Sequence, residues 1–180
     1  MINDVEKTLL SCEQLNQIVT DLGARISKDY EGKNLLMVSI LKGSVVFMAD
    51  LMRAVTIPCS IDFMSVSSYG SGTRTSGTVK IVKDLDIDLG GYDLLLVEDI
   101  LDSGLTLSYV RDMLMTRIPA SIRICTLLDK PARRIADIKA DYVGAEIPDD
   151  FVIGYGLDYD EKYRNLPFVG ILSPRVYADK

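Results

Sequence analysis

A run of apolar residues over positions 94–97 ends at two adjacent carboxylates, Glu98 and Asp99, and the turn Asp-Ser-Gly-Leu-Thr follows at 102–106. Because parallel strands that are buried on both faces lose their polar alternation, the apolar run predicts a strand inside a parallel sheet. Apolar residues then recur at helical spacing from Leu107 to Leu114, which predicts a helix. The small residues before this helix leave backbone N–H groups free to face an anion at its N-terminus. The segment therefore predicts a phosphate site beside a carboxylate pair that suits sugar hydroxyls or a metal ion.

Strand and helix patterns alternate along the chain. Ser11 and Gln14 have the spacing of a capping box, and apolar residues at helical intervals predict a first helix from there to about residue 29. The patterns predict further helices over residues 45–53 and from Thr106 onward, and strands over residues 35–41, 62–66, 78–82, 94–97, 122–128 and 142–143. This alternation is typical of an α/β fold with a mostly parallel sheet that is covered on both faces. We expect a single domain over residues 1–180, because neither a linker nor a repeat divides the chain.

Four loops with informative sequences each follow a predicted strand. They are residues 42–44, which include Lys42 and Gly43, the Ser/Gly-rich stretch 67–77, residues 98–106, and residues 129–134, which include Lys130. Because ligands bind beyond the carboxyl ends of the strands in such sheets, we expect these loops to meet in one site. The stretch 67–77 cannot form a core and is predicted to be a mobile loop. Taken alone, Lys42 is equally well explained as a solvent lysine, and Lys130 as part of a basic surface loop.

A further segment carries Phe151 at the start of a short hydrophobic stretch, Asp158 at its end, and Arg164 beyond it. The aromatic face suits a stacked base, the carboxylate suits a metal ion, and the cation suits a diphosphate. The alternative interpretation has Phe151 in the core and Asp158 paired with Arg164 on the surface.

The chain contains no histidine. This absence excludes Ser-His-Asp triads, Cys-His pairs and histidine metal sites, so a general acid or base must be Asp, Glu, Lys, Tyr or Cys. A metal ion held by carboxylates would be a hard cation, which points to Mg²⁺. The three cysteines are scattered and lack a C-x-x-C spacing, so they indicate neither a disulfide framework nor a zinc site.

The charge and hydropathy of the chain limit its partners. A net charge of −6 without any Lys/Arg block argues against nucleic-acid binding. No stretch approaches the roughly 20 apolar residues that a membrane helix needs. Charged residues at positions 4, 6 and 7 do not resemble the start of a signal peptide. We therefore expect a cytoplasmic protein that binds neither nucleic acid nor membrane.

Taken together, these segments resemble the purine phosphoribosyltransferase family, in its bacterial hypoxanthine-guanine form. The resemblance rests on Leu41-Lys42-Gly43-Ser44, Ser67-Ser68-Tyr69-Gly70, the segment 97–106, Leu128-Asp129-Lys130 and the segment 151–164, which keep the family's motif order over nearly the whole chain. It implies a type I phosphoribosyltransferase fold, with a mostly parallel twisted sheet, flanking helices and a small hood region. The implied reaction moves the phosphoribosyl group of phosphoribosyl diphosphate to N9 of hypoxanthine or guanine with Mg²⁺ as cofactor. The family also implies a homo-oligomer, either a dimer or a tetramer.

The same resemblance implies roles for individual residues. Asp102 matches the general base at N7 of the purine, and Lys130 matches the donor to its 6-oxo group. Phe151 should stack on the purine, while Val152 offers backbone groups to its edge. The implied Mg²⁺ ligands are Glu98, Asp99 and Asp158. The other implied substrate contacts, to the ribose, the 5′-phosphate, the diphosphate and the closing loop, are Lys42, Gly43, Ser68, Tyr69, Glu98, Asp99, Ile100, Leu101, Ser103, Gly104, Leu105, Thr106 and Arg164. The family also holds the peptide bond before Lys42 in the cis form.

Two other functions stay open at this point. A related enzyme would use adenine or xanthine; Lys130 and the pair of Phe151 and Val152 argue against adenine, whereas xanthine is an open third substrate. A ligand-sensing regulator that kept the fold would bind RNA or DNA. Such a regulator needs a basic surface, and this chain is acidic.

Overall fold

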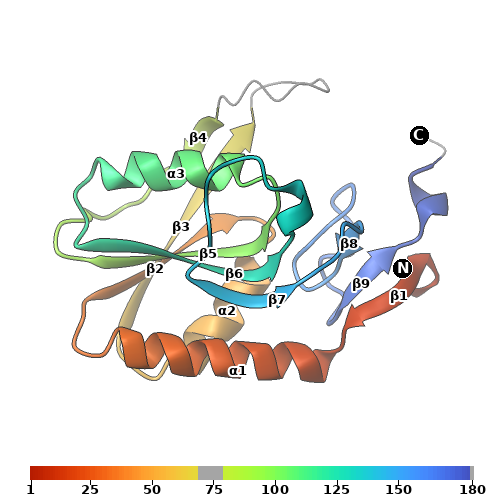
Figure 1. The fold of residues 1–180 in the computed structure, drawn as a ribbon, viewed down its shortest axis with the longest axis horizontal. Helices are drawn as coiled ribbons and strands as arrows, with labels where there is room; N and C mark the ends of the chain where they lie inside the picture. The colour runs from red at the N-terminus through yellow and green to blue at the C-terminus, as the bar shows by residue number, and fades with distance from the viewer. Residues whose placement is uncertain (69–78, 179–180) are drawn as a thin grey trace.

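A six-stranded sheet forms the centre of the computed structural model, which describes residues 1–68 and 79–178 (Figure 1). Its strands are β2 (Leu35–Leu41), β3 (Cys59–Ser68), β4 (Val79–Lys83), β5 (Asp93–Leu101), β6 (Ser121–Asp129) and β7 (Tyr142–Glu146). Neighbouring strands follow the order β4-β3-β2-β5-β6-β7, and every pair except β3 with β4 is parallel. The mostly parallel sheet predicted from the sequence is therefore confirmed.

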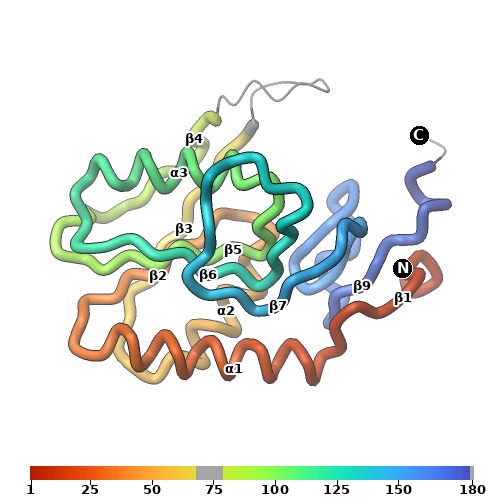
Figure 2. The backbone as a smooth tube through the Cα atoms, in the orientation of Figure 1, coloured from red at the N-terminus to blue at the C-terminus, as the bar shows by residue number. Residues whose placement is uncertain are grey.

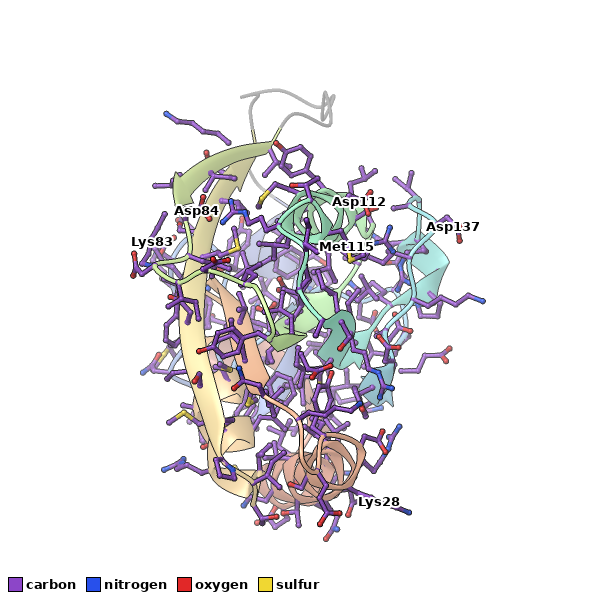
Figure 3. All side chains as sticks on the ribbon, turned by 90° about the vertical axis from the view of Figure 1, so that its left-hand side faces the viewer. Lys28, Lys83, Asp84, Asp112, Met115 and Asp137 are labelled. Carbon is purple, nitrogen blue, oxygen red and sulfur yellow. The ribbon has the colours of Figure 1, made fainter. Side chains whose placement is uncertain are left out.

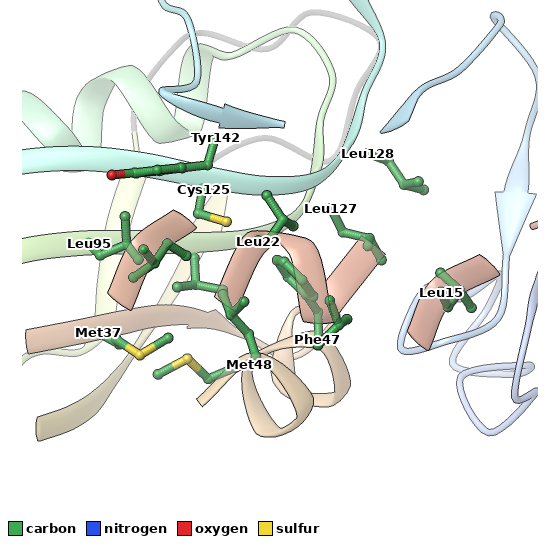
Figure 4. Close-up of a cluster of buried hydrophobic side chains, with 14 of the residues drawn as sticks. Leu15, Leu22, Met37, Phe47, Met48, Leu95, Cys125, Leu127, Leu128 and Tyr142 are labelled. Carbon is green, nitrogen blue, oxygen red and sulfur yellow. The ribbon is translucent and has the colours of Figure 1, made fainter. Parts of the chain in front are cut away.

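Helices cover both faces of this sheet. The helices α1 (Cys12–Asp29) and α2 (Val45–Ala54) pack on one face, and α3 (Leu105–Met115) packs on the other (Figure 1). Successive residues of β5 point to opposite faces, so Leu95 packs with α1 and α2, as Figure 4 shows, while Leu96 packs with α3. Both side chains are fully buried, which explains why this strand lacks polar alternation. None of the described helices has the length and apolar character needed to cross a membrane.

The first helix begins and ends where the sequence predicts. Ser11 Oγ accepts a hydrogen bond from the backbone N–H of Gln14 at 3.3 Å, and the Gln14 side chain accepts one from the Ser11 N–H at 2.8 Å. This capping box provides partners for backbone donors that a helix start otherwise leaves without any. The helix then continues to Asp29.

A second, smaller sheet stands beside the first. It consists of β1 (Val5–Leu10), β9 (Val169–Leu172) and β8 (Val152–Ile153) in that order, and both pairings are antiparallel. Figures 1 and 2 show this sheet next to the carboxyl ends of β5 and β6, and it corresponds to the small hood region that the family resemblance implied. The hydrophobic patterns of the sequence predicted none of its three strands.

Two strands of the main sheet are longer than their apolar patterns predicted. β5 continues past Val97 because its ladder with β6 extends through Glu98, opposite Thr126, to Leu101, opposite Asp129. The expectation that the acidic pair lies in a loop is therefore wrong, since Glu98 and its neighbour lie in the strand. β3 likewise begins at Cys59 rather than at residue 62.

At the end of the molecule away from the small sheet, an ion pair links the segment after β4 to the end of α3. Figure 3 views this end and labels Lys83 and Asp84, which lie at the end of β4 and in the segment after it. Arg117 donates two hydrogen bonds to Asp84, at 2.8 and 2.7 Å, and thereby ties that segment to the end of α3.

Candidate active site

Two adjoining pockets open at the carboxyl edge of the main sheet. The first, of about 240 Å³, lies between the loop after β2, the end of β5 and the start of α3. The second, of about 200 Å³, lies between β5, the segment after β6 and residues 150–158. Each is smaller than the roughly 300–1,000 Å³ of a typical ligand site. Ile100 and Asp102 line both pockets, so a ligand that spans the two would pass these residues.

The first pocket contains the start of α3. Gly104 is the N-cap residue, with a φ of +77°, and it offers no side chain to cap the helix. The Ser103 hydroxyl accepts only a long hydrogen bond, of 3.4 Å, from the N–H of Leu105. Because the first turn of a helix has unpaired N–H groups and a partial positive charge, this end suits an anion such as a phosphate. A Cβ at position 104 would lie 2.5 Å from Ile138 Cγ2, which together with the positive φ explains the glycine.

The loop after β2 lies directly against the acidic end of β5. The peptide bond between Leu41 and Lys42 is cis, as the family resemblance implied. A Cβ at Gly43 would overlap the Oδ2 atom of Asp99, so only glycine lets the backbone approach this carboxylate so closely. The loop and the carboxylate therefore form one wall of the first pocket.

Glu98 and Asp99 are partly buried neighbours that line the first pocket. Burial raises the pKa of Glu98 well above its ordinary value, and the charge of Asp99 raises it further. Burial also raises the pKa of Asp99, to about 6, although the N–H of Ile100, which donates to Asp99 Oδ1 at 2.9 Å, acts in the opposite direction. Two such carboxylates are costly to ionise together unless a cation compensates them. The pair therefore has the electrostatic character of a cation site.

The protein groups alone do not complete a metal site. Among the residues that the structure describes, no group of three or more His, Cys, Asp or Glu side chains is arranged to hold a metal ion. Asp158, the third implied ligand, lines the second pocket. Mg²⁺ typically takes one or two carboxylates together with substrate oxygens and water. Glu98 and Asp99 thus fit such an ion when a substrate supplies its other ligands.

Lys130 and Phe151 line the second pocket. The Lys130 side chain is only 7% exposed, and its ammonium group donates a hydrogen bond to the backbone O of Asp150 at 2.8 Å. Since an ammonium group has three donors, further donors are available to a ligand. Phe151 is 44% exposed, and its ring packs edge-on against Tyr159, with 5.5 Å between the ring centroids. Lys130 is therefore not a surface lysine and Phe151 is not a core residue; together they offer a stacking face and a buried donor.

Asp102 stands at the junction of the two pockets. Its Oδ1 atom is buried, and no group in the described part of the chain donates a hydrogen bond to it. A buried polar atom without a partner is costly, so each such atom in a folded protein calls for an explanation. An N–H group of a ligand that spans both pockets would satisfy this oxygen.

Arg164 lines neither of these two pockets. Its guanidinium group donates to the backbone O of Gly156 at 2.9 Å and forms ion pairs with Asp158 at 3.0 Å and Glu161 at 3.4 Å. The pairing of Asp158 with Arg164 that the sequence allowed is thus present. Glu161 also forms an ion pair with Lys42 at 3.1 Å, so one carboxylate links the two cations that were implied for a diphosphate.

The structure brings most of the implied site residues together. The lining of the first pocket includes Lys42, Gly43, Glu98, Asp99, Ile100, Leu101, Asp102, Ser103, Gly104 and Thr106. The lining of the second includes Ile100, Asp102, Lys130, Phe151, Val152 and Asp158. Leu105 begins α3 without lining either pocket, and Ser68 is the last residue of β3. Tyr69 and most of the predicted loop 67–77 lie outside the described residues.

Sequence reasoning missed several residues of the site. The pocket linings also contain Ile40, Leu107, Arg133 and Leu157. Arg134 was missed as well, although its guanidinium group donates to backbone oxygens at the end of β5. The two consecutive arginines after Lys130 were the available signal. These arginines indicated a basic loop, but the sequence does not show which of their side chains points toward the end of β5.

Comparisons with known proteins identify the family to which the chain belongs. A family model described as "Phosphoribosyl transferase domain" matches residues 7–160. A hypoxanthine-guanine phosphoribosyltransferase from Bacillus subtilis is 53% identical over 177 residues, which are 98% of this chain and 98% of that protein. A crystal structure of a hypoxanthine phosphoribosyltransferase from Staphylococcus aureus matches with a TM-score of 0.96 at 52% identity, covering 98% of this chain and 96% of that one.

Some relatives are much longer than this chain. A protein from Listeria monocytogenes named "Bifunctional protein TilS/HprT" is 51% identical over 179 residues, which are 99% of this chain but 28% of that protein. The chain therefore spans less than a third of the length of that relative.

Proposed function

The chain belongs to the phosphoribosyl transferase family, and we propose that it transfers the 5-phosphoribosyl group of phosphoribosyl diphosphate to N9 of hypoxanthine or guanine. The products are IMP or GMP and diphosphate. Relatives of matching length that are 52–53% identical carry the name of this reaction. The single observation that carries the proposal is the unpartnered Oδ1 atom of Asp102, between an anion-binding pocket and a pocket with a buried ammonium group.

The phosphoribosyl group would occupy the first pocket and the purine the second. The first-turn N–H groups of α3 would bind the 5′-phosphate, because they combine free donors with the positive end of the helix dipole. The purine would stack on Phe151, with its 6-oxo group accepting a hydrogen bond from Lys130. Adenine presents an amino group at the same position, and two facing donors repel each other. Lys130 thus favours oxopurines over adenine.

Asp102 would act on the proton at N7 of the purine. As the C1′–O bond to diphosphate breaks, the ribose gains positive charge and N9 attacks C1′, which makes the N7 proton more acidic. A carboxylate that no protein donor occupies can accept this proton as it is released. The backbone N–H groups of Lys42 and Gly43 and the guanidinium group of Arg164 would stabilise the leaving diphosphate. For this, Arg164 would give up its ion pair with Glu161 and bind the diphosphate instead.

Glu98 and Asp99 would hold Mg²⁺ from the first pocket and Asp158 from the second, with substrate oxygens supplying further ligands. The fit rests on the raised pKa values of Glu98 and Asp99. Burial disfavours the ionised form of both carboxylates, and a bound cation would compensate for this. When bound, Mg²⁺ supplies positive charge to the ribose hydroxyls and the diphosphate. Family membership further supports a cytoplasmic homo-oligomer, either a dimer or a tetramer, without nucleic-acid or membrane partners.

An assay of nucleotide formation tests this proposal. The purified protein is given phosphoribosyl diphosphate and Mg²⁺ with hypoxanthine, guanine, xanthine or adenine in separate reactions, and the new nucleotide is followed by absorbance. We expect turnover with hypoxanthine or guanine, no turnover with adenine, and loss of activity when EDTA removes the metal. Folded protein that binds phosphoribosyl diphosphate but converts no base would contradict the proposal and favour the ligand-sensing regulator.

A further inference from the structure

The guanidinium group of Arg134 binds four oxygens at once. Its Nε atom donates to the backbone O of Asp102 at 2.9 Å, Nη1 donates to that of Ile138 at 2.9 Å, and Nη2 donates to that of Leu101 at 3.1 Å. Nη2 also pairs with the carboxylate of Asp129. The Arg134 and Asp129 side chains are only 16% and 20% exposed. Arg134 therefore joins the end of β5, the end of β6 and the far side of the loop that carries Arg134 itself.

The same loop supports the turn after β5 at further points. The backbone O of Ser103 accepts hydrogen bonds from the N–H groups of Ile135 and Ala136, at 2.9 and 3.0 Å. A Cβ on Gly104 would meet Arg134 Cδ at 3.1 Å, so the arginine stem also packs against the start of the phosphate-binding turn. The segment after β6 thus holds the turn with Asp102 through the main-chain oxygens of Leu101, Asp102 and Ser103.

The carboxylate of Asp102 lacks such support at its Oδ1 atom. Within the described chain no donor reaches its buried Oδ1 atom, so hydrogen bonds to this atom cannot set its direction. The main chain therefore contributes to its placement, and Arg134 holds the main-chain oxygen of this same residue. We propose that Arg134 is a positioning residue, which fixes the main chain of Asp102 so that its carboxylate faces N7 of the purine. This inference rests on the proposed function.

Arginine suits this task better than lysine. A guanidinium group presents five donors in a rigid plane, whereas an ammonium group is a point charge with three donors on a flexible stem. Lysine at position 134 keeps the charge opposite Asp129 but cannot reach the oxygens of Leu101, Asp102 and Ile138 together. The Arg134→Lys variant therefore keeps the positive charge and removes the hydrogen bonds that hold the main chain.

The test compares Arg134→Lys with Arg117→Lys. Arg117 also makes two hydrogen bonds to a carboxylate and is 30% exposed, but it binds Asp84, which lies away from the site (Figure 3). Because small misplacement of a catalytic group is costly, we expect Arg134→Lys to lower kcat by about 10- to 100-fold, with KM for phosphoribosyl diphosphate changed less than about threefold. Arg117→Lys should keep kcat within about twofold, even if thermal unfolding shows a comparable loss of stability.

A double variant separates positioning from general structural support. If Arg134 acts through Asp102, the effect of Arg134→Lys should largely disappear once Asp102 is replaced. The double variant should then have a kcat within about threefold of that of Asp102→Asn alone. An equal loss in both backgrounds, or a wild-type kcat in Arg134→Lys, would overturn the positioning role while leaving the transferase activity established. Absence of nucleotide formation by the wild type would instead overturn the proposed function, and this inference with it.

Should Arg134→Lys not fold, Asp129→Asn takes its place in the same cycle, because it removes the charge that holds the guanidinium group.

Discussion

Replacing Asp102 by asparagine is expected to lower kcat by about 10²- to 10⁴-fold, the usual contribution of a positioned general base. Asparagine keeps the size of the side chain and one oxygen that can accept the N7 hydrogen bond, but it cannot take up the proton. Both substrates should therefore still bind, with dissociation constants within about threefold of the wild-type values. Steady-state kinetics gives kcat, and calorimetric titration gives the affinity for phosphoribosyl diphosphate with Mg²⁺.

A matched control is Asp112→Asn on α3. Asp112 is exposed and pairs with Arg111, and Figure 3 labels it on α3, the helix that follows the turn at residues 102–104. This variant removes the same charge without touching either pocket, so its kcat should stay within about twofold of wild type. A kcat within about threefold of wild type in Asp102→Asn would remove Asp102 from the role of general base.

Replacing Lys130 by methionine should weaken purine binding far more than the binding of phosphoribosyl diphosphate. The buried ammonium group already donates to the backbone O of Asp150 and keeps other donors for the purine. A hydrogen bond to a charged group contributes about 1.5–3 kcal/mol, so the loss corresponds to about 10- to 150-fold in purine affinity. Methionine preserves the length and apolar packing of the stem. The measurement is KM for hypoxanthine and guanine beside KM for phosphoribosyl diphosphate.

The base preference provides a second readout for Lys130. Without the ammonium donor, the ratio of kcat/KM for hypoxanthine to that for adenine should fall, because the repulsion of the adenine amino group is removed. Lys139→Met, at an exposed position of the same loop, is the control and should leave both KM values unchanged. An equal weakening of both substrates in Lys130→Met would show that Lys130 supports the fold rather than the purine.

Much of the site could be predicted because its motifs are contiguous. The strand, the acidic pair and the turn proposed to bind phosphate follow one another from β5 to the start of α3, so local patterns predicted that Asp102 and Gly104 lie between a strand and a helix. The convergence of loops that follow different strands was predictable as well, because parallel strands end at the same edge. The individual roles of these residues stay predictions until the variants are measured.

Other features depend on contacts between distant residues and leave no local pattern. β1 pairs with β9 through Val5 and Leu172, which lie at opposite ends of the sequence, and β8 has only two residues. The extension of β5 through Glu98 follows from its ladder with β6, not from hydrophobicity. The inward direction of Arg134 likewise depends on carbonyl groups of separate elements, so no sequence motif could indicate it.

The central claim is that a nucleotide spans the two pockets with Asp102 between them, and a crystal structure of the complex with IMP tests it most directly. We predict that the 5′-phosphate contacts the N–H groups of residues 104–106 and that the purine stacks on Phe151. The 6-oxo group should lie about 3 Å from Lys130 Nζ, and N7 about 3 Å from a carboxyl oxygen of Asp102. A purine bound outside the second pocket, or an Asp102 carboxylate that contacts no ligand atom, would contradict the account.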